Sequence, residues 1–107
     1  MQFNFKTLWV GLSVAGSLLL ADVAAADEKL AEKSGCLACH NVDVKVIGPA
    51  YKDVAAKYKD DKEAVDKLVA KVKGGGSGVW GNDVMIPNAH VKDEDIKTLV
   101  RWVLSLK

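Results

Sequence analysis

Apolar residues recur at the three- and four-residue spacing of an amphipathic helix in three parts of the chain. The three stripes are Tyr51, Val54, Ala55 and Tyr58; Val65, Leu68, Val69 and Val72; and Ile96, Leu99, Val100 and Val103. They predict a helix with Pro49 in its first turn and helices over residues 61–73 and 93–106. Acidic residues followed by Gly35 predict another helix over residues 27–34. No segment alternates convincingly with period two, so the pattern predicts an all-α domain.

The longest stretch without a helical stripe is residues 74–92, and it begins with the glycine-rich sequence Gly-Gly-Gly-Ser-Gly after Lys73. A loop of this length without secondary structure is uncommon in a compact domain and is usually functional. We therefore expect an irregular loop here, with a backbone that packs against something other than a neighbouring helix or sheet.

The first 26 residues have the three parts of a secretory signal peptide. Lys6 supplies a short basic region, residues 8–21 are apolar and uncharged, and residues 24–26 are alanines that suit a signal peptidase. Cleavage after Ala26 leaves residues 27–107 as one exported domain. An uncleaved membrane anchor is the alternative, but the apolar run is shorter than the about 20 residues with which a helix crosses a bilayer.

Composition narrows the class of protein. With 15 basic and 14 acidic residues the net charge is +1, which argues against a nucleic-acid-binding surface. The 2 cysteines are too few for a disulfide framework. A domain as small as residues 27–107 buries little surface and is marginally stable without help. We therefore expect a bound group to complete its core, and the chain without that group to be largely unfolded.

Residues 36–40 read Cys-Leu-Ala-Cys-His, the signature of covalent c-type haem attachment. Thiols at Cys36 and Cys39 can reach the two vinyl groups of one porphyrin, and His40 then lies under the iron as the proximal ligand. A thioredoxin-like thiol oxidoreductase would need a βαβ unit, which the pattern lacks. A zinc site would have only His90 to add to these three ligands. A disulfide that spans so few residues would stabilise little.

Two residues compete for the sixth position on the haem iron. Met85 is the only methionine after the leader, and it lies in the glycine-rich loop beside Pro87, where no helical stripe requires it. We predict Met85 as the ligand. His90 is the alternative, which would give a bis-histidine site. A single histidine on a loop is more often exposed to solvent, and we assign His90 to that role.

Three further residues suit a haem pocket. The Pro49 carbonyl can accept a hydrogen bond from Nδ1 of His40, which fixes the imidazole ring and raises its basicity. Trp80 needs an acceptor for its indole N–H if it is buried, and a haem propionate is one. Lys71, near the end of the predicted third helix, can reach the other propionate oxygens.

Beyond these residues the chain resembles the small bacterial class I cytochromes c of the c-551/c-552 type. The similar segments are residues 35–40 (Gly-Cys-Leu-Ala-Cys-His), 48–55 (Gly-Pro-Ala-Tyr-Lys-Asp-Val-Ala), 76–81 (Gly-Ser-Gly-Val-Trp-Gly), 85–88 (Met-Ile-Pro-Asn) and 102–105 (Trp-Val-Leu-Ser). The resemblance implies the class I cytochrome c fold, with four helices wrapped around one covalent haem c and the first and last helices crossing. It also implies His40 and Met85 as axial iron ligands, and Asn88 as a residue that bonds the ligand sulfur.

The resemblance further implies a periplasmic one-electron carrier that is not an enzyme. Its transient partners would be a quinol-oxidising cytochrome complex as donor and a terminal oxidase, nitrite reductase or peroxidase of the respiratory chain as acceptor. With both axial positions filled, no open site remains on the iron for a gas or a substrate. A haem enzyme or gas-binding haem protein with a labile sixth ligand is the alternative. We expect a monomer that neither binds nucleic acid nor inserts stably into a membrane.

Electrons are expected to cross at the exposed haem edge near the thioethers. By the resemblance, an apolar patch at this edge consists of Leu37, Val46 and Ile47. A cationic surround would be formed by Lys33, Lys45 and Lys52.

Two residues depart from the family pattern. Ile86 stands where the family usually has a proline after the ligand methionine, which predicts a looser loop and a more labile iron–sulfur bond. Lys92 stands where a helix-capping serine is common, so we expect Asp93 to cap the last helix.

Overall fold

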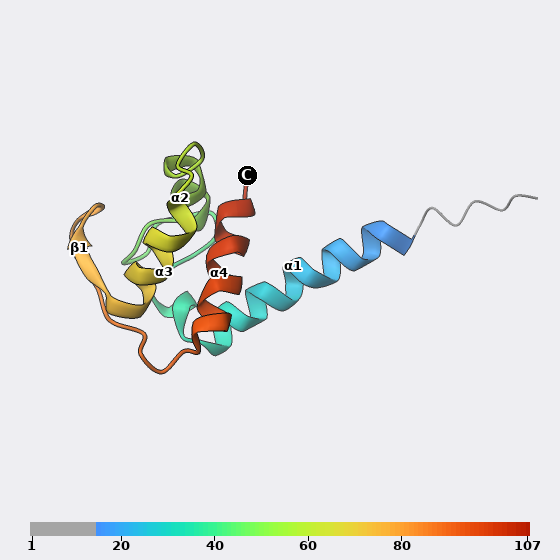
Figure 1. Ribbon diagram of the computed structural model, residues 1–107, viewed down its shortest axis with the longest axis horizontal. Coiled ribbons are helices and arrows are strands. Elements are labelled where there is room, and N and C mark those ends of the chain that lie inside the picture. Colours follow the sequence, from blue (N-terminus) through green and yellow to red (C-terminus); the bar gives the residue numbers. More distant parts are fainter. Residues whose placement is uncertain (1–14) are drawn as a thin grey trace, which may run out of the picture.

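The computed structural model describes residues 15–107, with side chains from Val23 onward. Its elements are α1 (Ala15–Lys33), the short 3-10 helix η1 (Cys36–Ala38), α2 (Tyr51–Lys57), α3 (Ala64–Gly74), the strands β1 (Gly76–Gly78) and β2 (Gly81–Met85), and α4 (Asp93–Ser105). Figure 1 shows α1 leading away from the group of α2, α3 and α4, with β1 on the opposite side of that group. Lys6 and about half of the predicted apolar run lie outside the described residues.

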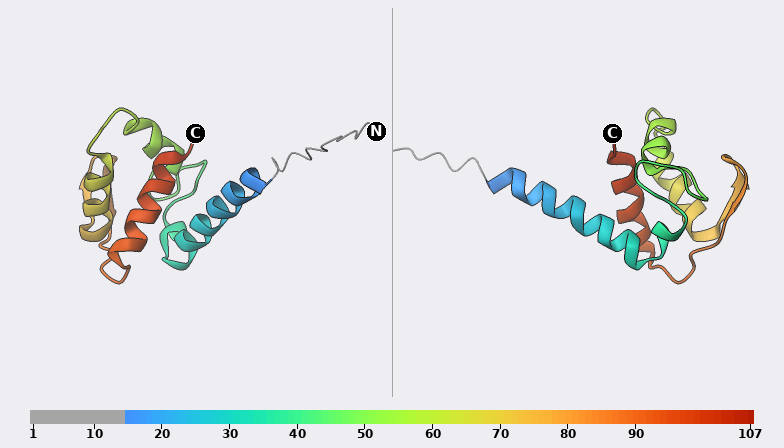
Figure 2. Two further views of the ribbon diagram at one scale, coloured as in Figure 1. Left: turned by 45° about the vertical axis from the view of Figure 1, so that its right-hand side comes forward. Right: turned by 180° about the vertical axis from the view of Figure 1, so that it is seen from behind.

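Helix α1 begins earlier than predicted, because it runs unbroken from Ala15 through the predicted cleavage position to Lys33 (Figure 2). The alanine-rich sequence around that position favours helix. The helix ends close to where the sequence predicts: Ser34 N donates to the Leu30 carbonyl at 2.9 Å, and Gly35 takes a φ of 85° that favours glycine. Among residues 15–107, none of the helices combines the length and the apolar composition needed to cross a membrane.

Helices α2 and α3 both begin later than their predicted starts. Pro49 precedes α2 instead of lying in its first turn, and Ala50 occupies the N-cap. Before α3, the Asp61 side chain accepts a hydrogen bond from Glu63 N at 2.8 Å, and the Asp61 carbonyl accepts one from Ala64 N at 3.2 Å. An aspartate that bonds the backbone two residues ahead competes with helix formation. Residues 61–63 therefore form a turn, and α3 begins at Ala64.

Helix α4 is central to the hydrophobic core. Its predicted stripe is buried, and Ile96 is 0% exposed. One cluster joins α4 to α1 and α2 and consists of Ala31, Tyr51, Val54, Leu99, Trp102 and Val103. A second joins α4 to α3 and consists of Val91, Ile96 and Val100, with the partly buried Val65, Leu68, Val69, Val72 and Leu104 packed against it.

The expected cap of α4 is wrong. Lys92 occupies the N-cap position and no side chain caps it, while Asp93 is already the first residue of the helix. The Asp93 carboxylate pairs instead with Lys73 Nζ at 2.9 Å. The helix starts where the stripe predicts and ends one residue earlier, at Ser105.

The expectation of an irregular loop over residues 74–92 is wrong for its first half. Strands β1 and β2 form an antiparallel hairpin in which Gly76 lies opposite Met85 and Gly78 opposite Gly81. Strand β1 reads Gly-Ser-Gly, and four of the five residues of β2 are exposed, so neither strand shows the alternation that identifies a half-buried strand. Gly78 and Gly81 flank the turn with φ values of 102° and 94°, which residues with a Cβ rarely adopt.

Candidate functional site

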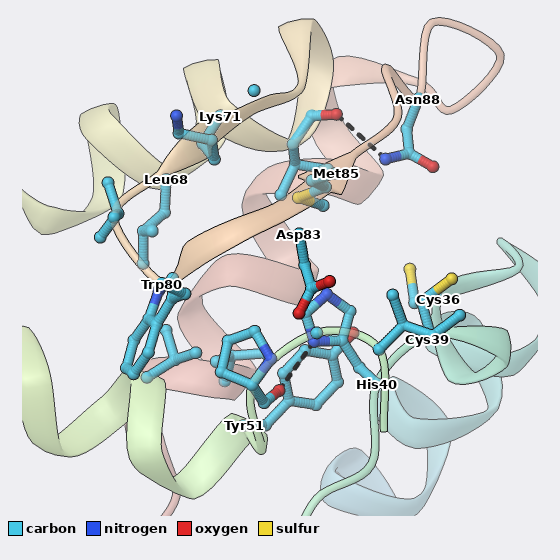
Figure 3. Close-up of a pocket in the computed structure, with 18 of the residues that line it drawn as sticks. Cys36, Cys39, His40, Tyr51, Leu68, Lys71, Trp80, Asp83, Met85 and Asn88 are labelled. Atoms are coloured by element: carbon cyan, nitrogen blue, oxygen red, sulfur yellow. Dashed lines mark hydrogen bonds between the residues drawn. The ribbon is translucent and has the colours of Figure 1, made fainter. Parts of the chain in front are cut away.

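A cavity of about 500 Å³ lies between the helices and the β1–β2 hairpin (Figure 3). Ligand pockets typically measure about 300–1,000 Å³. The apolar part of its wall includes Tyr58, Leu68, Val72, Leu99, Val100 and Val103. All the site residues predicted from the sequence also line it: Cys36, Cys39, His40, Pro49, Lys71, Trp80, Met85 and Asn88. The fold thus gathers residues from distant parts of the chain around one apolar space.

Cys36 and Cys39 reach the cavity from a single turn of chain. Cys39 N and His40 N donate to the Cys36 carbonyl oxygen at 3.2 and 3.0 Å, which closes the turn. Both thiols are free and half-buried, so no disulfide joins them. Burial raises the pKa of the Cys36 thiol, although its hydrogen bond with Tyr51 opposes this effect.

The His40 ring is held on three sides. Its Nδ1 lies 2.8 Å from the Pro49 carbonyl oxygen, which can only accept, so Nδ1 donates. Nε2 of the neutral ring then keeps a free lone pair. The Tyr51 ring stacks on the imidazole with centroids 4.8 Å apart. Gly48 lies so close that a Cβ there would fall 2.8 Å from Nδ1. The imidazole therefore has one orientation and one free nitrogen.

Met85 lines the same cavity from the wall opposite His40, at the end of β2 (Figure 3). The segment after Met85 is fixed by Asn88. Both the backbone N and the side-chain Nδ2 of Asn88 donate to the Val72 carbonyl at 3.1 Å, and Nδ2 also lies 3.2 Å from the Ile86 carbonyl. The amide of Asn88 therefore donates to backbone carbonyls, whereas the family resemblance assigns it to the Met85 sulfur.

Trp80 and Lys71 bring N–H groups to the cavity from the hairpin turn and from α3. Trp80 is 39% exposed, and its ring lies 5.4 Å from Nζ of Lys57 at the end of α2. Lys71 is half-buried, and its Nζ lies beside Gly76, where a Cβ would fall 2.8 Å from it. Both side chains can thus donate hydrogen bonds at a cavity whose lining is mainly apolar.

His90 lies outside this cavity. It is exposed, and its Nε2 is 3.4 Å from the Ser34 carbonyl oxygen. It lines a separate depression of about 250 Å³ together with Leu30, Lys33 and Val91. Among the residues that the structure describes, no three His, Cys, Asp or Glu side chains are grouped to hold a metal ion. His90, the fourth ligand of the zinc alternative, lines a different cavity from Cys36, Cys39 and His40.

Two further residues contribute to the cavity in ways that the sequence does not indicate. The helical stripe predicts Tyr51 only as a core residue, yet its ring also covers His40 and meets Trp102 edge-on at 5.6 Å. Asp83 of β2 lines the cavity and pairs with Lys45 at 3.7 Å. A hairpin without alternating hydrophobic residues gives no signal of which residues face inward. The stacking on His40 likewise follows only from the fold.

The residues present fit a covalently attached haem. Two free thiols lie on one turn, the next residue offers an imidazole with a single free nitrogen, and the cavity beside them is large and mainly apolar. The cytochrome c family model matches residues 24–107. The chain belongs to the cytochrome c family.

Individual relatives are similar over most of the chain. Cytochrome c-552 of Nitrosomonas europaea is 53% identical over 102 residues, which cover 95% of this chain and 99% of the relative. Cytochrome c-551 of Allochromatium vinosum is 57% identical over 90 residues, which cover 84% and 96%. The crystal structure of Nitrosomonas europaea cytochrome c552 matches with a TM-score of 0.73 at 54% identity, and it covers 75% of this chain and 99% of its own.

Family membership establishes the general function. The chain has the class I cytochrome c fold predicted from its sequence, with a small two-stranded sheet added to the four helices. It carries one haem c, bound covalently in the region of Cys36, Cys39 and His40. It is an electron carrier that works with redox partners and is not an enzyme. The alternatives of a haem enzyme and of a thiol oxidoreductase are thereby removed.

Proposed function

We propose that this chain is a periplasmic one-electron carrier whose haem iron is bound by His40 and Met85. The observation that carries the proposal is that both side chains line one cavity from opposite walls, while His90 lines a separate depression. The Pro49 carbonyl engages Nδ1 of His40 and leaves Nε2 for the iron. The haem supplies the one-electron chemistry, and the protein sets its potential, burial and docking.

Replacing Met85 tests the ligand assignment. In the holoprotein, Met85→Ala is expected to open the sixth position, to admit carbon monoxide to the reduced protein and to lower the potential by on the order of 0.1 V, within the range of about 0.8 V that axial ligands set. His90→Ala serves as the control and is expected to change neither property. Redox titration and absorption spectra provide the measurements, and a pyridine haemochrome assay verifies the c-type haem. An unchanged potential in Met85→Ala contradicts the proposal.

The polar residues at the cavity receive roles in the same proposal. We assign the N–H groups of Lys71 and Trp80 to the haem propionates, because both bring donors to a mainly apolar cavity. Pro49 orients His40. We assign Asn88 to holding the Met85 segment through the carbonyls of Val72 and Ile86, since its amide donates to them.

The proposed docking face includes the cavity-lining residues Ile47, Val84 and Ile86 and is more apolar than the resemblance implies. Val46 and Ile47 are 49% and 53% exposed. The hairpin side adds Val84 and Ile86, which are 65% and 69% exposed. Leu37 is half-buried and packs against the core, so it contributes less than expected.

The charges beside this face are largely compensated. Lys45 pairs with Asp83 at 3.7 Å, and Lys52 pairs with Asp43 at 2.6 Å. Lys33 lies at the depression that contains His90. We therefore propose weak charge steering and transient apolar contact with a quinol-oxidising complex as donor, and with a terminal oxidase, nitrite reductase or peroxidase as acceptor.

Export is proposed from the leader. Residues 1–26 have the signal-peptide pattern. The crystal structure of the Nitrosomonas europaea relative covers 99% of its own chain but 75% of this one, a difference about the size of that leader. N-terminal sequencing of protein from a periplasmic fraction is expected to begin at Asp27. Protein that retains Met1 would contradict the assignment.

A further inference from the structure

The segment that carries Met85 is tied to the last turn of α3 at two neighbouring residues. Asn88 donates to the carbonyl of Val72 through its backbone N and its side chain. The next residue, Lys73, donates from Nζ to the Val91 carbonyl at 3.0 Å and pairs with Asp93 at 2.9 Å. The first tie lies inside the segment, and the second lies where the segment ends and α4 begins.

The contacts of Lys73 join parts of the chain that differ in burial. Val91 is 6% exposed and packs with Ile96 and Val100 of α4, so the Lys73 ammonium reaches the edge of the core. The Lys73 side chain is 41% exposed and that of Asp93 is 75% exposed. No side chain caps α4 at Lys92. The Lys73 ammonium is therefore a polar partner for Asp93, the first residue of the helix.

We propose that Lys73 is a positioning residue for Met85, which acts by holding Val91 and Asp93 against the end of α3. This inference rests on the proposed ligation of the iron by Met85. With the end of the segment fixed, we expect motions that withdraw the Met85 thioether to strain the Lys73 contacts. An exposed ion pair contributes little to folding stability. The effect is therefore expected in the exchange of the ligand more than in global unfolding.

Imidazole binding to the oxidised holoprotein, followed by absorbance, measures how readily Met85 leaves. Lys73→Met keeps most of the apolar stem and removes the donor, and it is expected to raise the imidazole association constant about fivefold, the size of one lost hydrogen bond. Lys67→Met is the matched control, because Lys67 lies on the same helix but pairs with Asp61 at 2.8 Å. It is expected to change binding less than about twofold. Lys73→Arg, which keeps the charge and the donors, is expected to resemble the native protein.

Three outcomes separate this inference from the ligand assignment. Equal imidazole binding by Lys73→Met and the native protein, while Met85→Ala binds more tightly than both, overturns the role of Lys73 and leaves the ligation intact. Met85→Ala binding no better than the native protein overturns the ligation itself. If Lys67→Met raises the imidazole association constant as much as Lys73→Met does, the effect comes from the loss of positive charge in general, and the inference is also overturned.

Amide hydrogen exchange provides a measurement that does not depend on an added ligand. The Val91 N–H bonds the Asn88 carbonyl at 3.1 Å, whereas the Ile96 N–H bonds the Lys92 carbonyl inside α4. Lys73→Met is expected to speed exchange at Val91 about fivefold relative to Ile96. Unchanged exchange at Val91 contradicts the inference.

Discussion

The imidazole of His40 is confined by three neighbours of different kinds. The Pro49 carbonyl accepts from Nδ1, the Tyr51 ring covers one face, and Gly48 presents no side chain at all. Gly48 is not among the glycines with positive φ. Glycine is therefore needed at residue 48 for space and not for backbone conformation.

Gly48→Ala is expected to destabilise the folded holoprotein by about 2 kcal/mol, because the new Cβ overlaps the His40 ring and forces it or the backbone to shift. Denaturant unfolding measures the change. Gly74→Ala is the matched control: it lies at the end of α3 with nothing within 4 Å of an added Cβ. Its stability is expected to stay the same or to rise by up to about 1 kcal/mol. Equal denaturation midpoints for Gly48→Ala and Gly74→Ala would contradict a steric conflict between residue 48 and the His40 ring.

Asp83 places a carboxylate at a cavity that holds a redox group. A negative charge favours the oxidised state, so Asp83→Asn is expected to raise the reduction potential by about 20 mV, the interaction of two unit charges about 10 Å apart in water. Asp43→Asn is the control, since Asp43 is also exposed and paired with a lysine but does not line the cavity. Redox titration of both holoproteins at one ionic strength compares them, and an equal shift in both would exclude a specific effect of Asp83.

At the scale of secondary-structure elements, the sequence predicts helices whose apolar residues recur periodically and motifs whose residues are adjacent in the chain. The stripe of α4 is buried as its spacing requires, and residues 36–40 identify the haem because they are adjacent in the chain. The predicted start of α3 at residue 61 is wrong because the Asp61 turn competes with the helix. Strands β1 and β2 could not be predicted, because glycine and exposed residues leave no alternating pattern. Asp83 lies at the cavity because it belongs to this hairpin, so its position could not be predicted either.

The packing of α4 against α3 is expected to depend on Ile96. Ile96→Ala removes the most deeply buried side chain of α4 and is expected to cost about 3 kcal/mol of unfolding free energy. Val44→Ala, at a side chain that is 58% exposed, is the control and is expected to change stability by less than about 0.5 kcal/mol. Urea unfolding of the holoproteins gives both values. A cost below about 1 kcal/mol for Ile96→Ala would mean that the α3–α4 cluster contributes little.

At the scale of the whole molecule, the haem is part of the core. Tyr58, Leu68 and Val72 line the cavity and are only partly buried by the rest of the chain, so part of their apolar surface faces water when no haem is bound. The small domain has little other core with which to compensate. We therefore expect haem binding and folding to be coupled.

A chain in which Cys36 and Cys39 are both replaced by alanine, produced without haem, is expected to be largely unfolded. Far-UV circular dichroism should show a small fraction of the helix content of the holoprotein, and thermal unfolding should lack a cooperative transition. The holoprotein measured at the same concentration is the reference. A cooperative transition in the haem-free chain with native helix content would contradict the coupling.

The paired lysines beside the cavity have a consequence for the surroundings in which such a carrier operates. Lys45 and Lys52 are already matched by Asp83 and Asp43, so the apolar face made by Val84 and its neighbours has little charge to be screened. The Debye length falls from about 10 Å at 0.1 M salt to about 3 Å at 1 M, which abolishes long-range steering but leaves apolar contact in place. If the proposed docking face is used, we expect partner binding to tolerate wide changes in salinity and to depend on shape and hydrophobicity more than on opposite charge.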